Sequence, residues 1–268
     1  TKAQELIATS QISKAQARVA AAKPFADQIT SILTDLASAS SIQHRMLNEP
    51  EDAKRSAVLV VTSDRGMCGG YNYNVLKEAA ELIAYLESEG REVDIYVLGS
   101  KGIVHYTFRE IPIAGSWHGH SQKPDYQAPR PEFQLLSTAF AVGGEGTFDA
   151  AEYLGEDYTG ETTRKGVDEV HIVYTQFKSM LTQTPQARRL APIETKVEVE
   201  RLDLGEDMLD TSRTDFKPEV SFEPDADTLL DNLLPRYMST RAFASLLESA
   251  ASESAARRTA MKSATDNA

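Results

Sequence analysis

The heptad seam at each end of the sequence constrains the fold most, because it predicts two long helices whose apolar stripes need partners. Near the N-terminus, nine successive positions spaced by three or four residues are all apolar: Ala8, Ile12, Ala15, Val19, Ala22, Ala26, Ile29, Leu33 and Leu36. This spacing is typical of a left-handed coiled coil. A helix over residues 1–47 would be about 70 Å long. We expect Pro24 to kink this helix or to loosen one turn.

The C-terminal seam has the same spacing but becomes thinner and smaller along its length. Its positions are Leu230, Leu233, Tyr237, Thr240, Ala244, Leu247, Ala251, Ser254, Arg258, Met261, Thr265 and Ala268. We predict that Pro235 marks the first turn of this helix, where its missing N–H costs nothing. Antiparallel pairing of the two helices would bring the ends of the chain together. Packing of each helix on the central region alone is the alternative. Neither end carries a capping motif, so we expect both helices to continue past the printed residues.

Between the two seams, predicted strands and helices alternate as they do in an α/β domain. Residues 57–64 (AVLVVTSD) form a short β-branched run, which is typical of a strand buried on both faces. An amphipathic helix over residues 74–90 and a strand at 93–99 follow, and this order predicts a parallel, right-handed crossover. The later elements that we predict are a short helix at 100–108, a helix at 132–154, a buried strand at 168–177 and an edge strand at 194–202.

The predicted fold class is therefore α/β, with two long terminal helices in an antiparallel coiled coil and a Rossmann-like domain with a mostly parallel sheet. We divide the chain into an N-terminal coiled-coil helix (1–55), an α/β foot domain (56–205), an acidic linker (206–224) and a C-terminal coiled-coil helix (225–268).

Charge and cysteine content narrow the possible functions. The net charge of −12 argues against a general nucleic-acid binder. This charge is uneven, because residues 203–231 hold ten acidic and two basic side chains. No run approaches the ~20 apolar residues of a membrane span. A single cysteine excludes an internal disulfide framework and fits a reducing compartment.

The stretch VLVVTSDRGMCGGYNYNV, residues 58–75, allows several kinds of site. A phosphate-binding loop is one hypothesis, because the glycines follow a strand and precede a helix. The stretch nevertheless lacks the lysine of the Walker pattern and the spacing of the dinucleotide fingerprint. A thiol nucleophile is another, because Cys68 lies near a predicted helix N-terminus and Arg65, but no histidine is singled out as its base. His118 and His120 could supply two metal ligands, but no third ligand follows at the required spacing.

The third hypothesis is a shaped joint that performs no chemistry. Asp64 and Arg65 would pair with each other or with a partner chain, and Asn72 would cap the following helix. The glycines would allow positive φ and close approach of the backbone to a neighbour: Gly66, Gly69 and Gly70.

Four stretches of the sequence carry a family resemblance. TSDRGMCGGYNYNV resembles the S-D-R-G-x-C-G-G signature of the gamma subunits of rotary ATP synthases, and TKAQELIATSQISKAQAR is similar to their first helix. LGSKG follows the second strand as it does in that family, and ASESAARRTAMKSATDNA is very similar to the last helix. The four blocks occur in the family's order across nearly the whole chain. The connection at residues 155–169 is similar to the longer actinobacterial, mycobacterial-type form.

The resemblance implies a mechanical, non-catalytic subunit that holds no cofactor, metal or nucleotide. The paired helices would stand inside the ring of alpha and beta subunits, and the foot would contact the epsilon subunit and the c-ring. Torque driven by proton flow would pass through the chain. The protein would lie peripherally on the cytoplasmic face of the bacterial plasma membrane, touching the membrane only through the c-ring and binding no nucleic acid. The rival hypothesis is an independent α/β enzyme with a phosphate-bearing ligand at residues 66–70.

The resemblance also implies a set of interface residues. In the signature these are Asp64, Arg65, Gly66, Cys68, Gly69, Gly70 and Asn72; in the first helix Lys2 and Gln4; in the last helix Glu253, Arg257, Met261, Lys262, Asp266 and Asn267. We expect the polar members of the last helix to face the alpha/beta collar. On this interpretation, Arg257→Glu would leave the fold largely intact and weaken coupling.

Overall fold

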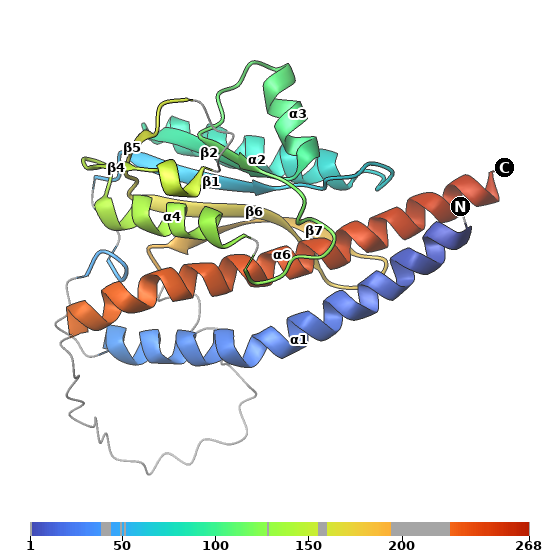
Figure 1. Cartoon of the computed structure of the whole chain (residues 1–268), viewed down its shortest axis with the longest axis horizontal. Coiled ribbons are helices and arrows are strands. Elements are labelled where there is room, and N and C mark those ends of the chain that lie inside the picture. The colour runs from blue at the N-terminus through green and yellow to red at the C-terminus, as the bar shows by residue number, and fades with distance from the viewer. Residues whose placement is uncertain are drawn as a thin grey trace, which may run out of the picture.

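Two long helices lie side by side along one edge of the protein. The computed structural model describes residues 2–38, 44–48, 50, 52–127, 129–154, 160–193 and 226–267. Helix α1 (Lys2–Ser38) and helix α6 (Ala226–Asp266) run antiparallel, and the two ends of the chain lie together (Figure 1). The antiparallel pairing predicted from the seams is therefore confirmed. The α1 seam positions whose side chains are described are all buried: Ile12, Ala15, Ile29 and Leu33.

Two predicted features of the helices are wrong. Helix α1 ends at Ser38, and residues 44–48 form a turn instead of continuing the helix to Leu47. Pro235 lies inside α6, which begins at Ala226. A proline in a helix interior costs about 3 kcal/mol, but Leu230 and Leu234 on either side of this turn are buried in the core. Their burial offsets the lost hydrogen bond, while Pro235 itself is exposed.

A five-stranded sheet in the order β3-β2-β1-β6-β7 forms the centre of the foot domain. The bounds are β1 Arg55–Val61, β2 Glu92–Leu98, β3 Gly115–Trp117, β6 Glu169–Phe177 and β7 Gln183–Ala191. The first four strands of this order are parallel, and β7 pairs antiparallel with β6. The mostly parallel sheet is therefore confirmed.

Hydrophobic side chains cover both faces of the sheet. Val58 and Val60 of β1 belong to the core under α2 (Tyr71–Ser88), which α3 (Ser100–Phe108) also borders. Leu59 and Val61 of β1 belong to the opposite core, which contains side chains of α4 (Arg130–Val142), α6 and α1. Strand β1 is thus buried on both faces, as predicted. Helix α6 contacts α1 on one side and the sheet on the other, so both packing alternatives hold for it.

The region after α4 departs from the sequence-based expectation. The predicted helix at 132–154 ends at Val142, because Gly143 takes a φ of 80° and terminates it. A small antiparallel sheet follows, made of β4 (Thr147–Asp149) and β5 (Thr163–Lys165), with a 3-10 turn at Ala151–Tyr153 (η1). Strands β3 and β7 were not predicted. The expected edge strand at 194–202 and the acidic linker lie outside the described residues.

None of the described helices combines the length and the apolar character needed to cross a lipid bilayer.

Candidate functional site

Residues 62–70 join β1 to α2, and we call them the glycine loop. The loop lies at the carboxyl edge of the sheet, beside the point where the chain order reverses between β1 and β6. In open α/β sheets, ligands bind in the crevice at this switch point. Here α6 occupies the position. The hydroxyl of Ser252 donates to the carbonyl of Thr175 (3.1 Å), and the backbone N–H of Thr175 donates to Oγ of Ser249 (3.3 Å). The hydroxyl of Tyr71 donates to the carbonyl of Ser249 (3.4 Å).

Small side chains allow α6 to approach the strand ends this closely. Every residue from 249 to 255 is at most 3% exposed. This stretch reads SAASESA, so alanine and serine make up all of it except Glu253. A helix that is buried on all sides needs side chains that leave room for its neighbours on every face. The small side chains of this seam therefore allow α6 to pack between the sheet and a second helix.

Asp64 connects three segments at the start of the loop. Its Oδ2 accepts the backbone N–H of Gly119 and of Ser121, both at 3.0 Å. Its Oδ1 accepts the backbone N–H of Ser100 (3.1 Å). Burial alone would raise the pKa of Asp64, but these N–H donors outweigh burial and the pKa is lowered. Asp64 is thus an internal anchor, and its expected pairing with Arg65 is not seen.

Asn72 and Cys68 hold the loop from within. Asn72 is not the helix cap that we expected, because α2 begins at Tyr71 and the cap position is Gly70. Its Oδ1 instead accepts the backbone N–H of Ser63 (2.9 Å), and its Nδ2 lies 3.3 Å from Sγ of Cys68. Cys68 is 2% exposed, and its other polar neighbours are the hydroxyl of Ser63 and the carbonyl of Arg65. None of these groups is a general base, so the thiol-nucleophile hypothesis gains no support.

Glu253 and Arg257 face the loop. Glu253 is 1% exposed, and Arg257 donates to its Oε1 (2.7 Å) and to the carbonyls of Arg65 and Gly66. Burial raises the pKa of Glu253, although Arg257 opposes the rise. Both residues were expected to face the alpha/beta collar, but within this chain Glu253 is buried and Arg257 turns toward the loop. Their pair fastens the loop to α6.

Only one of the three loop glycines needs its special conformation. Gly69 has a φ of 57°, whereas Gly66 and Gly70 have no positive φ. A Cβ at Gly66 would meet nothing closer than 3.8 Å. The second residue of the loop with positive φ is Met67, which sequence reasoning had no signal to find.

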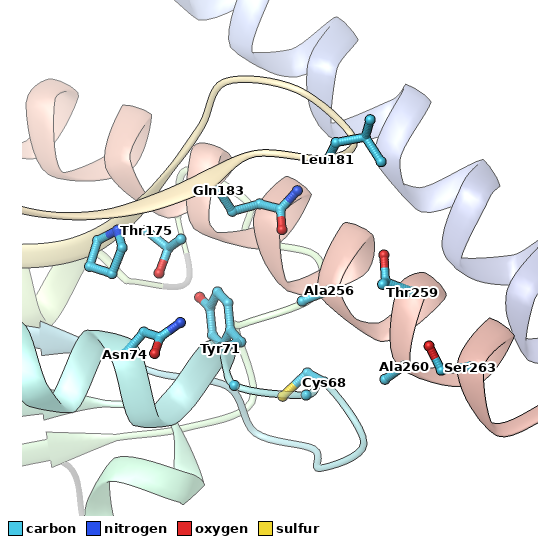
Figure 2. A pocket seen from close by; sticks show the side chains of 13 residues that line it. Cys68, Tyr71, Asn74, Thr175, Leu181, Gln183, Ala256, Thr259, Ala260 and Ser263 are labelled. Carbon is cyan, nitrogen blue, oxygen red and sulfur yellow. The ribbon is translucent and has the colours of Figure 1, made fainter.

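A groove of about 410 Å³ opens beside the loop, between the N-terminus of α2, the β6–β7 hairpin and α6. Figure 2 shows Tyr71, Thr175 and Gln183 around it, with Ala256 and Ala260 on the α6 side. All of the 13 residues that line the groove are uncharged. A phosphate group would meet no cation there, so the groove does not support the phosphate hypothesis.

The remaining predicted residues are spread along the two helices. Met261 is buried, and Lys262, Asp266 and Asn267 are exposed at the end of α6. Lys2 and Gln4 lie in the first turn of α1, and their side chains are outside the described part of the structure. His118 and His120 join no group of three metal-ligating side chains among the described residues.

Sequence reasoning missed several contributors to this site. Tyr71 lies in the signature stretch but was not selected as an interface residue. Ser121 follows no motif, and Gln122 contacts Glu253 across 131 residues of chain. Glu132, buried at the start of α4, was also missed. A carboxylate on the apolar side of a predicted amphipathic helix is the one signal that could have identified it.

Comparison with known proteins agrees with this arrangement. A family model described as ATP synthase matches residues 1–268. The ATP synthase gamma chain of Corynebacterium urealyticum is 59% identical over 268 residues, and that of Nocardia farcinica is 57% identical over 270 residues. Each match covers the whole chain and 82% or 81% of the relative.

Among solved structures, the central stalk and c-ring of the Tetrahymena thermophila mitochondrial ATP synthase contain a chain of similar fold. The TM-score is 0.66 at 20% identity, covering 98% of both chains. Family model, full-length relatives and fold agree, and the chain belongs to the family of ATP synthase gamma chains.

Proposed function

We propose that this chain is the central-stalk rotor subunit of a proton-translocating ATP synthase and passes torque from the membrane c-ring to the catalytic alpha and beta subunits. The two long helices would stand inside the alpha/beta collar, and the foot domain would contact the epsilon subunit and the c-ring. The chain itself catalyses no reaction. It lies peripherally on the cytoplasmic face of the bacterial plasma membrane.

The attachment of the two paired helices, which we call the shaft, to the foot domain carries this proposal. Helix α6 is one half of the antiparallel pair and also a core element of the foot, because Ser249 and Ser252 bond directly to the end of β6. A shaft that transmits torque needs such a rigid attachment. The same helix lines the crevice where an α/β enzyme would hold its ligand, and the groove that remains beside it has no charged lining residue, which counts against the rival enzyme hypothesis.

The exposed residues of the predicted interface fit this arrangement. Lys262, Asp266 and Asn267 are free to contact the collar from the end of α6. At the foot, α3 exposes two apolar side chains one turn apart, Val104 (63%) and Phe108 (84%), and Ile111 (37%) is exposed just after the helix. Apolar groups that gather on one exposed surface are typical of protein contacts. We assign this α3 surface to the foot's contact with epsilon and the c-ring.

Co-purification with partner subunits tests the proposal. The chain should assemble with alpha, beta and epsilon subunits, and the purified chain should neither bind nor hydrolyse ATP. Phe108→Ser should weaken recovery of epsilon and the c-ring without changing the fold. Leu181→Ser, at an equally exposed apolar residue of the β6–β7 hairpin (92%), is the matched control and should assemble normally. ATP turnover by the purified chain, or no assembly at all, would refute the proposal.

A further inference from the structure

The segment between β3 and α4 crosses the junction of the foot and the two long helices. We call residues 118–127 the strap; Figure 1 shows this segment in green, passing over α6 before α4 begins. At its first end, Gly119 and Ser121 donate to Asp64 of the glycine loop, and Oγ of Ser121 accepts the backbone N–H of Asp64 (3.0 Å). The strap is therefore anchored to the foot by three hydrogen bonds to one residue.

Further along, the strap contacts both long helices. The side-chain amide of Gln122 donates to Glu253 of α6 (3.4 Å). Arg18 of α1 donates to the carbonyl of Pro124 (3.4 Å). The ring of Tyr126 meets the ring of Phe243 of α6 edge to face, with centroids 5.3 Å apart. One short segment thus ties the foot to α1 and to α6.

The strap leads into a buried carboxyl group. Glu132 lies in the first turn of α4 and is 1% exposed. Its Oε1 is 3.8 Å from Nε2 of His120, and its Oε2 is buried without a hydrogen-bond partner. A buried carboxylate with an unpaired oxygen is costly, whereas the neutral acid is much less so. Burial raises the pKa of Glu132 to about 7.

The charged surroundings of Glu132 are sparse. His120 of the strap is the one titratable partner within ion-pair distance among the described residues. Arg130, on the same turn of α4, is exposed and forms no ion pair with Glu132. Burial is the largest cause of the raised pKa of Glu132, and no charged side chain in the part of the chain that the structure describes contributes to it. Its protonation therefore depends mainly on burial and on the closed position of the strap.

We propose that the strap is a proton-sensitive clamp, which fastens both long helices to the foot while Glu132 is protonated and loosens when Glu132 ionises. The sign follows from the raised pKa: the stabilisation is complete below the unfolded pKa and is lost as pH rises through about 7. The consequence for torque rests on the proposed rotor function. The clamp itself is a property of the isolated chain.

Hydrogen exchange on the purified chain tests the clamp. Corrected for intrinsic exchange, the opening constant at the amides of Gly119 and Ser121 should rise about tenfold between pH 6 and pH 8.5. Glu132→Gln imitates the neutral acid, so its opening constant should stay constant. Glu87→Gln, at an exposed glutamate of α2, is the control and should follow the wild type.

Thermal unfolding supplies a second measurement. The Tm of the wild type should come closest to that of Glu132→Gln near pH 4, below the unfolded pKa, and the advantage of the variant in Tm should grow as pH rises to 8.5. A flat wild-type response, an equal response in Glu132→Gln, or a variant already destabilised at pH 6 would overturn the clamp. Because these experiments need no partner subunit, their failure is distinct from a failure to assemble with alpha, beta and epsilon.

Discussion

Asp64 shows how one side chain of the signature organises the carboxyl edge of the sheet. Its two oxygens accept backbone N–H groups from the start of α3 and from the strap, so the loop, the helix and the strap share one anion. Hydrogen bonds to a charged acceptor are stronger than neutral ones. The motif's aspartate therefore has a structural role within this chain.

Asp64→Asn should destabilise the chain, because an amide nitrogen would face N–H donors. The expected loss is roughly 1–3 kcal/mol in the free energy of unfolding at pH 7. The pKa of Asp64 is lowered, so its contribution is present above the unfolded pKa and disappears as pH falls through the folded pKa. Urea unfolding should show the variant and wild type converging in acid. Asp266→Asn, at an exposed position, should unfold like the wild type at every pH.

Arg257→Glu should disrupt the fold locally, contrary to the expectation from sequence alone. The substitution places a second carboxylate beside buried Glu253 and removes the donor to the loop carbonyls. Breaking such a pair costs on the order of 3 kcal/mol. The single thiol, Cys68, should react faster with Ellman's reagent as the loop loosens. Lys262→Glu, five residues further along α6 and exposed, should leave the thiol protected; equal reactivity in the two variants would contradict the assignment.

Helix α6 is the element on which the architecture depends most. It covers one face of the sheet, pairs with α1 and supplies the partners of the glycine loop. Its composition changes to match: large side chains such as Leu230 and Leu234 meet the core, and small ones follow where three neighbours converge. The size of the side chains along α6 therefore matches the space available at each turn.

Ala255→Leu should force α6 away from its neighbours. Ala255 is fully buried, and overpacking a tight site typically costs 1–3 kcal/mol, so a loss of roughly that size is expected. Chemical denaturation measures it. Ala264→Leu, nine residues later on an exposed turn, adds the same side chain without crowding and should be nearly neutral. A neutral Ala255→Leu would mean that the helix is loosely seated.

At the scale of the whole molecule, shaft and foot share one hydrophobic core. The larger core cluster joins Ile29 and Leu33 of α1 to Leu59 of β1 and Ile172 of β6, with α6 residues between them. A continuous core favours cooperative unfolding. We therefore expect the two parts to unfold together.

Leu33→Ala tests this sharing. Truncating a buried leucine costs roughly 2–5 kcal/mol, and Leu33 is 2% exposed on a helix of the shaft. Helix content by circular dichroism reports mainly the long helices, and the only tryptophan, Trp117 in β3, reports the foot. Both signals should lose the same number of degrees in Tm. A shift in the helical signal alone would show that the shaft unfolds independently of the foot.

How much of this follows from the sequence differs from one region to the next. The doubly buried β1, the parallel crossover and the two seams were predictable, because hydrophobic periodicity is a local property of the chain. Strand β7 was not, since QTPQARRLA has little strand preference and forms because β6 offers it a partner edge. The early end of α4 depends on Gly143, and a glycine in the sequence does not by itself distinguish a helix end from a position in a loop.

For the site, the sequence by itself determined which residues form the loop and that α6 carries a small-residue stripe. Only the tertiary structure decided that Glu253 and Arg257 turn inward, that Asp64 binds the strap, and that α6 packs against the end of β6. The physical reason is separation along the chain. These contacts join segments 55 to 192 residues apart, and which buried polar groups meet depends on how whole elements pack.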